Sequence, residues 1–498
     1  MVTAGGKESY KKNMNLFSTS AFLIWVSCLF AAYFSAKRGR FYLSLFFLTA
    51  AALVIRLFAA ADPWLHFWDE RYHFLVARNM LENPFQPVLY KLPLLDYDYR
   101  AWSQNHIWVH KPPMALWLIA GSFKAFGVSA FTGRLPSVFM SSAAVILVYQ
   151  VGLHFLGDRW QALACAFFQS VNGLTIELAA GRNPTDHVDT VFYFFILAGI
   201  WNSTRFAHSG KVAQAALTGV FLGLAVLTKW WVGLIIIPVF FILTLQKTGW
   251  KRASGWSILV LSTGLLIALP WQVYIHLHFP LEAAWESRFN LLHFTEVLEG
   301  HVHPWWFFLD RARTNWNELI YPAWLFFAYL LMKNRSRPEY WAIAVWSFLP
   351  YLVFSAAMTK MQGYILFTAP AQFMILALFL GFLSGRFNTR MGWAFRFVFA
   401  AVILLGLRYG YERARFFWPP EAQAAMNKDI KALTTQLDEK TVVFNTPYFI
   451  EIMFYTPAIA YERMPTEEDL NKLTKAGYQI RYAVLAEGHL KLMETPGH

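Results

Sequence analysis

The chain has 498 residues, of which 57% are hydrophobic and 15% charged, and its net charge is +13. Soluble domains carry about 25% charged residues, so this composition, with a mean hydropathy of +0.37, predicts an integral membrane protein and excludes an ordinary soluble one. Lys and Arg gather in short loops between apolar segments, which is the pattern of cytoplasmic loops and predicts no nucleic-acid partner. Cys28 and Cys165 lie within apolar segments, which argues against a disulfide framework.

Apolar segments recur along residues 1–410, and many reach the roughly 17–25 residues that cross a bilayer. Their order predicts a mainly α, polytopic transmembrane fold with about 11–13 spans. The first segment, 16–36, is expected to be a retained helix, because no small-residue cleavage site follows it. Residues 113–127 are apolar but short, which favours an interfacial helix. Alternating the spans places the long loops 62–113 and 277–318 together on the outer side.

The composition changes from about residue 411, where charged helical stretches begin to alternate with short apolar strands. The expected helices are 421–440, 450–455 and 465–476, and the expected strands are 441–445, 459–463 and 479–486. Thr466, followed by three acidic residues, is a plausible helix cap. The sequence therefore predicts a transmembrane domain over 1–410 and a small extracytoplasmic α/β domain over 411–498.

The loop 62–113 carries the densest group of polar residues. Asp69 and Glu70 follow a span beside Trp64 and Trp68. They can be read as an interfacial helix cap, or as carboxylates in a partly desolvated pocket, where one of them could act as a general base.

Three lysines, Lys111, Lys229 and Lys360, are predicted on the outer side, where the positive-inside bias would not place them. Each alone could extend its ammonium group towards lipid headgroups. Together they indicate an anionic ligand, and a lysine fixed at the membrane surface suits a lipid-linked phosphate.

The later loops contain weaker candidates. His301-Val302-His303 could bind a metal ion, although histidines beside Trp305 and Trp306 are also typical of an aromatic belt. Asp186 and Asp189 are three residues apart and share a face if a helix begins there. Alternatively, the two aspartates only stabilise the first turn of a helix, because Pro184 suits a helix start. The sequence favours neither interpretation.

In chain order, the informative segments share one feature: each combines charged or aromatic residues at the outer end of a predicted span. They are Asp69-Glu70-Arg71-Tyr72, His110-Lys111-Pro112-Pro113-Met114, Arg134-Leu135-Pro136-Ser137, Asp186 before Thr190, Leu227-Thr228-Lys229, His301-Val302-His303-Pro304-Trp305-Trp306-Phe307-Phe308 and Lys360 before Tyr364-Ile365-Leu366. This ordered set resembles the GT-C glycosyltransferases, in particular the superfamily of the lipid A aminoarabinose transferases and the protein O-mannosyltransferases.

The resemblance implies a polytopic helical GT-C fold and an inverting membrane glycosyltransferase. Its donor would be a polyprenyl-phosphate sugar, and its acceptor a protein, lipid A or an envelope glycan. The enzyme would lie in the bacterial inner membrane among membrane lipids, with an active site facing the periplasm.

The resemblance also assigns roles to residues. Asp69 becomes the general base, with Glu70 and Asp186 as further catalytic residues. The groups that would hold the donor phosphate are Lys111, Lys229, Lys360, Tyr364 and Arg134. In aminoarabinose transferases a Glu-Lys-Pro pattern supplies a ligand for a divalent metal ion. Here that glutamate is His110, so His110 and His301 are the candidate metal ligands, and no other cofactor is implied.

Two rival functions differ in what they require. Transfer of phosphoethanolamine would need a nucleophilic Thr or Ser among clustered metal ligands, which the sequence does not present. A lipid-carrier transporter or flippase predicts broken helices and polar groups at midspan, whereas the polar clusters here fall at span ends. The insert 92–108 is longer than expected for an aminoarabinose transferase, so the acceptor is left open.

Overall fold

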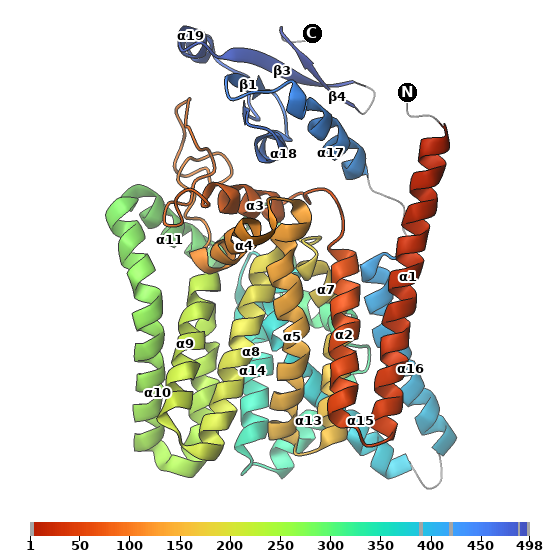
Figure 1. Ribbon diagram of the computed structural model, residues 1–498. Coiled ribbons are helices and arrows are strands. Elements are labelled where there is room, and N and C mark those ends of the chain that lie inside the picture. Colours follow the sequence, from red (N-terminus) through yellow and green to blue (C-terminus); the bar gives the residue numbers. More distant parts are fainter. Residues whose placement is uncertain (1–3, 388–391, 418–421, 487–488, 496–498) are drawn as a thin grey trace. The chain divides into compact units, whose positions relative to one another are not determined.

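The structure is a computed structural model that describes residues 4–387, 392–417, 422–486 and 489–495, and most of these residues are α-helical (Figure 1). The chain forms two compact units. Unit 1 contains Met1–Ala61, Leu135–Tyr274 and Phe289–Phe417, and unit 2 contains Asp62–Arg134, Ile275–Arg288 and Trp418–His498. The first long loop and the C-terminal residues therefore belong to the same unit, although more than 280 residues separate them.

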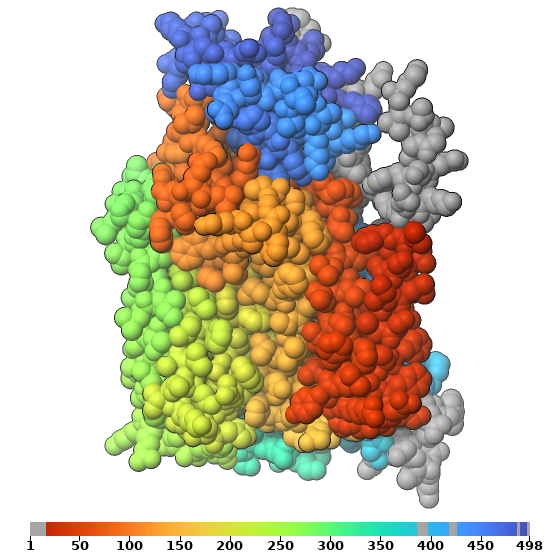
Figure 2. Space-filling view, viewed as in Figure 1, coloured from red at the N-terminus to blue at the C-terminus, as the bar shows by residue number. Residues whose placement is uncertain are grey.

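Unit 1 is built from helices. Those that lie within it are α1 (Ala4–Lys37), α2 (Phe41–Ala59), α6 (Arg159–Val171), α7 (Gly173–Ala179), α8 (Asp186–Ser209), α9 (Val212–Lys229), η1 (Trp230–Ile235), α12 (Phe307–Asn315), α13 (Ile320–Lys333), α14 (Pro338–Ala356), η2 (Gln362–Thr368), α15 (Ala369–Phe387) and α16 (Gly392–Ala414). Helices α5 (Ala130–Leu156), α10 (Ile236–His278) and α11 (Pro280–Thr295) belong partly to each unit. Helices α1 and α2 lie side by side in Figure 1, and from residue 16 onwards they form one continuous red surface in Figure 2.

Several helices are long and apolar enough to cross a membrane. Among the described residues these are Leu16–Lys37, Phe41–Ala59, Ala130–Leu156, Val212–His278 and Gln362–Gly385. The segment Val212–His278 has 67 residues and includes a non-helical residue at Gly249, so it is long enough for more than one crossing. The chain is therefore a multi-pass membrane protein, whereas the count of about 11–13 spans stays a prediction.

Two consecutive helices, α6 and α7, would form a further span if they are counted as one bent pair. Helices α6 and α7 are bent by 45° at Asn172, whose side chain accepts a hydrogen bond from the backbone N–H of Thr175. Asn172 thus caps α7 in place of the lost helical bond.

Unit 2 combines helices with a small sheet. Its elements are α3 (Asp69–Asn79), α4 (Pro113–Phe126), α17 (Ala422–Ala432), η3 (Leu433–Thr435), β1 (Thr441–Phe444), α18 (Phe449–Tyr455), β2 (Ile459–Ala460), α19 (Glu467–Lys475), β3 (Gln479–Ala486) and β4 (His489–Met493). The sheet order is β2-β1-β3-β4. Strand β1 runs parallel to both β2 and β3, whereas β4 runs antiparallel to β3. The predicted small α/β fold of the C-terminal residues is confirmed, whereas a separate domain over 411–498 stays a prediction. The fourth strand was not predicted because five residues carry little periodicity.

The capping motif that the sequence indicated is present in this domain. The Thr466 side chain accepts a hydrogen bond from the backbone N–H of Asp469, whose carboxylate in turn accepts from the backbone N–H of Thr466. This capping box satisfies two backbone donors that the first turn of a helix otherwise leaves unpaired. Helix α19 therefore begins at Glu467 rather than at residue 465.

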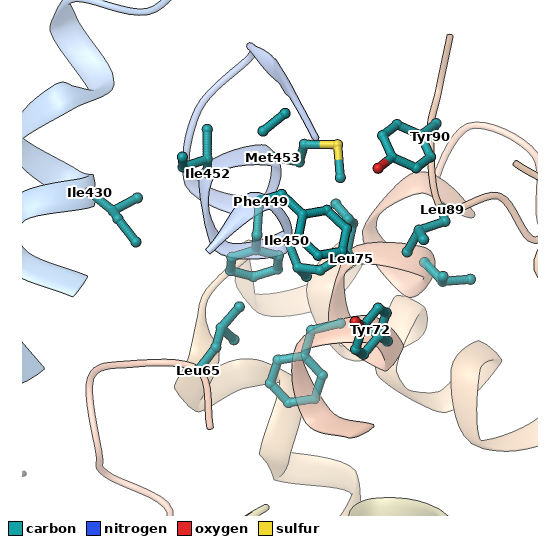
Figure 3. Close-up of a cluster of buried hydrophobic side chains, with 14 of the residues drawn as sticks. Leu65, Tyr72, Leu75, Leu89, Tyr90, Ile430, Phe449, Ile450, Ile452 and Met453 are labelled. Carbon is teal, nitrogen blue, oxygen red and sulfur yellow. The ribbon is translucent and has the colours of Figure 1, made fainter. Parts of the chain in front are cut away.

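One hydrophobic core joins the first loop to the C-terminal domain (Figure 3). Tyr72 and Leu75 of α3 pack in this cluster with Phe449, Ile450 and Met453 of α18. Burial of apolar surface contributes about 25 cal/mol per Å², so these contacts stabilise a shared core. Residues 62–134 are accordingly part of a folded unit rather than a surface loop.

Candidate active site

Helix α3 begins at Asp69 and directs successive side chains to different neighbours, because each residue turns by about 100°. The Asp69 carboxylate lies 3.6 Å from the Lys111 ammonium group, and both side chains are partly exposed. Asp69 and Glu70 occupy the first turn, where negative charge is favoured by the helix dipole. Unit 2 therefore brings together the predicted general base and one predicted phosphate-binding lysine.

Glu70 and Arg134 face the interior of unit 2. Arg134 donates from Nε to the Glu70 carboxylate at 2.6 Å, and neither side chain is exposed. The guanidinium also donates to the carbonyl oxygens of Asp62 and Trp64, each at 2.5 Å. These contacts favour a structural role for both residues. Catalysis by Glu70 and phosphate binding by Arg134 stay predictions.

The opposite side of α3 contacts the C-terminal domain. Arg71 donates to the Pro447 carbonyl at 2.8 Å and to the Glu451 carboxylate at 3.2 Å. Arg78, two turns later on the same face, donates to the Met453 carbonyl at 2.5 Å. The two arginines thus contact both ends of α18. Asp69 lies about 200° around the helix axis from Arg71, so it points away from α18.

His110 is buried and lies 3.0 Å, through Nδ1, from the Glu286 carboxylate of α11. Its ring stacks on Trp102 of the long insert, with centroids 4.6 Å apart. In the part of the chain that the structure describes, no group of three or more His, Cys, Asp and Glu side chains could hold a metal ion. His110 with Glu286 is a smaller set than the three or four protein ligands of a zinc site. The other predicted ligand, His301, belongs to unit 1.

His73 lies one turn after Asp69 on the same face of α3. Its ring is buried beside Trp108. Burial, opposed by the negative charge of Asp69 and reinforced by the positive charge of Lys111, lowers the pKa of His73 to about 3. His73 is therefore neutral at physiological pH and adds no charge beside Asp69.

Unit 1 contains a second aspartate–lysine pair. The Lys229 ammonium at the end of α9 contacts the Asp189 carboxylate in the first turn of α8, and it lies 4.5 Å from the centre of the Tyr364 ring. A Cβ atom at Gly363 would lie 2.5 Å from Asp189 Oδ2, so only glycine fits there. Among the described residues, this Asp189 oxygen has no hydrogen-bond partner.

The remaining predicted residues of unit 1 are more enclosed. Asp186 is fully buried, with one oxygen 4.0 Å from the ring of His187. Lys360 is buried, and its ammonium donates to the Ala357 carbonyl. Unit 1 therefore places Lys229 beside Tyr364 and pairs it with Asp189, whereas the predicted roles of Asp186, Lys229, Lys360 and Tyr364 stay predictions.

Some residues of these groups were missed in the sequence. For Asp189, which the sequence indicated beside Asp186, only the partner Lys229 was missed. Glu451 carried a signal, since it is a lone acid in the apolar run from Phe449 to Tyr455. Glu286 carried none, because its partner His110 lies 176 residues away in the chain.

Known proteins share both the sequence pattern and the fold. Residues 110–274 match the profile of the dolichyl-phosphate-mannose-protein mannosyltransferase family. The undecaprenyl phosphate-alpha-4-amino-4-deoxy-L-arabinose arabinosyl transferase of Pseudomonas savastanoi is 25% identical over 60% of this chain and 56% of that protein. Its counterpart from Pectobacterium carotovorum is 26% identical over 69% of this chain and 62% of that protein. The chain thus spans less than two thirds of the length of these relatives.

Two solved structures superpose over most of the chain. ArnT from Cupriavidus metallidurans in the apo state has a TM-score of 0.63 and 16% identity, and the match covers 90% of this chain and 93% of that chain. The archaeal oligosaccharyltransferase AglB from Archaeoglobus fulgidus has a TM-score of 0.58 and 13% identity, covering 88% and 69%. These likenesses confirm the GT-C fold, and the profile match and the bacterial relatives confirm the resemblance to the protein O-mannosyltransferases and the aminoarabinose transferases.

Proposed function

We propose that this protein is an integral-membrane glycosyltransferase that transfers a sugar from a polyprenyl-phosphate donor. The observation that carries the proposal is the Asp69–Lys111 pair on a fold shared over 90% of the chain with ArnT. The aminoarabinose relatives are named for undecaprenyl phosphate, and the ArnT structure has also been solved bound to that lipid. AglB has been solved with a dolichol-phosphate and an inhibitory peptide.

The proposed reaction is a direct displacement. Asp69 removes the proton from an acceptor hydroxyl or amine, and the freed electron pair attacks the anomeric carbon of the donor. The bond from that carbon to the phosphate oxygen breaks, its electron pair stays on the polyprenyl phosphate, and the configuration inverts. Lys111 leaves Asp69 for the departing phosphate, whose negative charge it stabilises.

Other residues have proposed roles in holding the donor. Lys229, with Tyr364, is assigned to the donor phosphate in unit 1, and Lys360 is a further candidate. His110 contacts Glu286 and stacks on Trp102. These contacts do not make up a metal site, so the proposed reaction includes no step through a metal ion. The acceptor is lipid A, an envelope glycan or a protein, and the site faces the periplasm of a bacterial inner membrane.

Transfer with purified full-length protein tests this function. The protein in nanodiscs is incubated with undecaprenyl-phosphate carrying labelled aminoarabinose, mannose or another sugar, and with lipid A or envelope extracts as acceptor. We expect label on an acceptor that depends on Asp69. If no donor yields transfer while an active aminoarabinose transferase works in parallel, the proposal is wrong.

Flipping of a lipid carrier is the second candidate, because α6 and α7 form a helix pair broken at Asn172. Broken helices near polar groups are typical of transporters. Liposomes containing the protein and a fluorescent undecaprenyl phosphate distinguish the two functions. Carrier movement between leaflets without sugar transfer would favour the flippase, and transfer without movement would favour the transferase.

A further inference from the structure

The segment Asp62–Trp68, between α2 and α3, is shaped by side chains rather than by a helix or strand. Its central residue is His66. Nδ1 of His66 lies 2.5 Å from the Glu70 carboxylate, and Nε2 lies 3.1 Å from the Asp62 carboxylate. The backbone N–H of His66 also donates to Glu70, at 3.2 Å. The segment is therefore folded around one imidazole ring.

Arg134 connects the His66 contacts to the interior of unit 2. It lies 3.0 Å from His66 Nδ1 and donates to the Glu70 carboxylate at 2.6 Å, so Glu70 contacts both residues. Because Glu70 and Arg134 are fully buried, losing one of these contacts would leave a buried charged group less well paired.

Trp68 lies between this network and Asp69 and has an unfavourable backbone conformation. Its φ is 77° and its ψ is −141°, a region that residues other than glycine rarely adopt. Such a conformation persists only when the surrounding structure holds it. His66 and Glu70, which flank Trp68 and Asp69 in the chain, are bonded to each other across this turn.

We propose that His66 is a positioning residue for Asp69. Its imidazole ring, held between Asp62 and Glu70, fixes the strained turn at Trp68 and thereby directs the Asp69 carboxylate. This inference rests on the proposed transfer function and extends it, because it gives Glu70 and Arg134 a role in aligning the base rather than in chemistry or phosphate binding.

Kinetics of His66→Gln test the proposal. We expect kcat to fall about tenfold, since misplacing a catalytic group by about 1 Å can cost up to about 100-fold, while the donor KM changes little. In an Asp69→Asn background, His66→Gln should lower the residual rate no further, because it acts only through Asp69. A further fall there, or a change in KM alone, overturns the proposal.

The strain at Trp68 gives a second comparison. Glycine adopts positive φ values such as the 77° of Trp68 without steric cost. In a chain with Trp68→Gly, the turn therefore depends less on the contacts of His66. His66→Gln should therefore reduce kcat by a smaller factor in the Trp68→Gly background than in the Trp68 background. Equal factors contradict the proposed link through the strained turn. Glu82→Gln, which breaks the exposed Lys91–Glu82 pair of unit 2, is the matched control and should leave kcat unchanged.

Hydrogen exchange separates failure of this inference from failure of the proposed function. In the full-length protein without donor, the peptide covering residues 62–75 should exchange faster after His66→Gln, with Glu82→Gln unchanged. If wild-type protein transfers no sugar, the proposed function fails and this exchange still decides whether His66 holds the turn. Unchanged exchange beside normal transfer overturns the positioning role alone.

Discussion

The two aspartate–lysine pairs, one in each unit, differ in how tightly they are held. Asp69 and Lys111 are 3.6 Å apart, with side chains 16% and 28% exposed. Asp189 and Lys229 are in direct contact, with side chains 3% and 18% exposed, and the Tyr364 ring lies beside the ammonium group. Gly363 leaves the space that the second pair needs.

This difference is consistent with the two roles proposed for these pairs. A general base must receive a proton, so its carboxylate needs a partner that it can release. A lysine that binds phosphate as a point charge gains from a fixed position. The looser pair suits proton transfer and the tighter pair suits anion binding, and the two should respond differently to substitution.

The largest effect is expected for Asp69→Asn. Removing the general base should lower kcat by about 100- to 10,000-fold, with the donor affinity retained. Asp189→Asn should cost about tenfold, or about 1.4 kcal/mol, mainly in the donor KM, because Lys229 remains but is less fixed. Transfer kinetics over a range of donor concentrations measure both variants. Equal losses of kcat would remove the distinction between the pairs.

The next largest effect is expected on the stability of α3, the helix that begins at Asp69. Glu451→Ala leaves Arg71 buried without its carboxylate, and breaking a buried ion pair costs about 3–5 kcal/mol of stability. Thermal unfolding and hydrogen exchange of α3 should both report this loss, while exchange around Lys229 stays unchanged. The control is Glu494→Gln, which breaks the exposed Arg481–Glu494 pair and should change stability by no more than about 0.5 kcal/mol.

Gly363→Ala tests the tighter pair. Its Cβ atom would lie 1.9 Å from Thr185 Oγ1 and 2.5 Å from Asp189 Oδ2, so the site must shift at a cost of about 1–3 kcal/mol. Binding of undecaprenyl phosphate should weaken, while transfer at saturating donor should still depend on Asp69. Gly385→Ala is the control, because a Cβ atom there meets nothing within 4 Å. Unchanged binding in the Gly363 variant would contradict the role of Lys229.

The smallest effect concerns acid stability beside Asp69. Burial lowers the pKa of His73 to about 3, below the value of about 6.5 in an unfolded chain. The unfolded state therefore binds the extra proton as the pH falls below about 6.5, and stability should decrease by up to about 1.4 kcal/mol per pH unit. His73→Leu should remove this slope in thermal unfolding between about pH 7 and pH 5. A slope that persists would assign it to other groups.

Local patterns predicted much of the fold. Apolar runs and basic loops indicated a multi-pass protein, and short strands beside charged helices indicated the C-terminal domain. The capping box at Thr466 was readable because both of its partners lie within a single helical turn. The break at Asn172 was not readable, since the surrounding residues have the composition of a continuous span.

Composition and short spacings were enough to indicate the class of protein and the order of its elements, and to single out Asp69, Lys111 and Lys229 as candidate site residues. The partner of each charge, in contrast, became known only from the folded chain. Arg71 contacts Glu451 across 380 positions, and Lys229 contacts Asp189 across 40. Such pairs depend on how helices pack, and chain spacing carries no information about that packing.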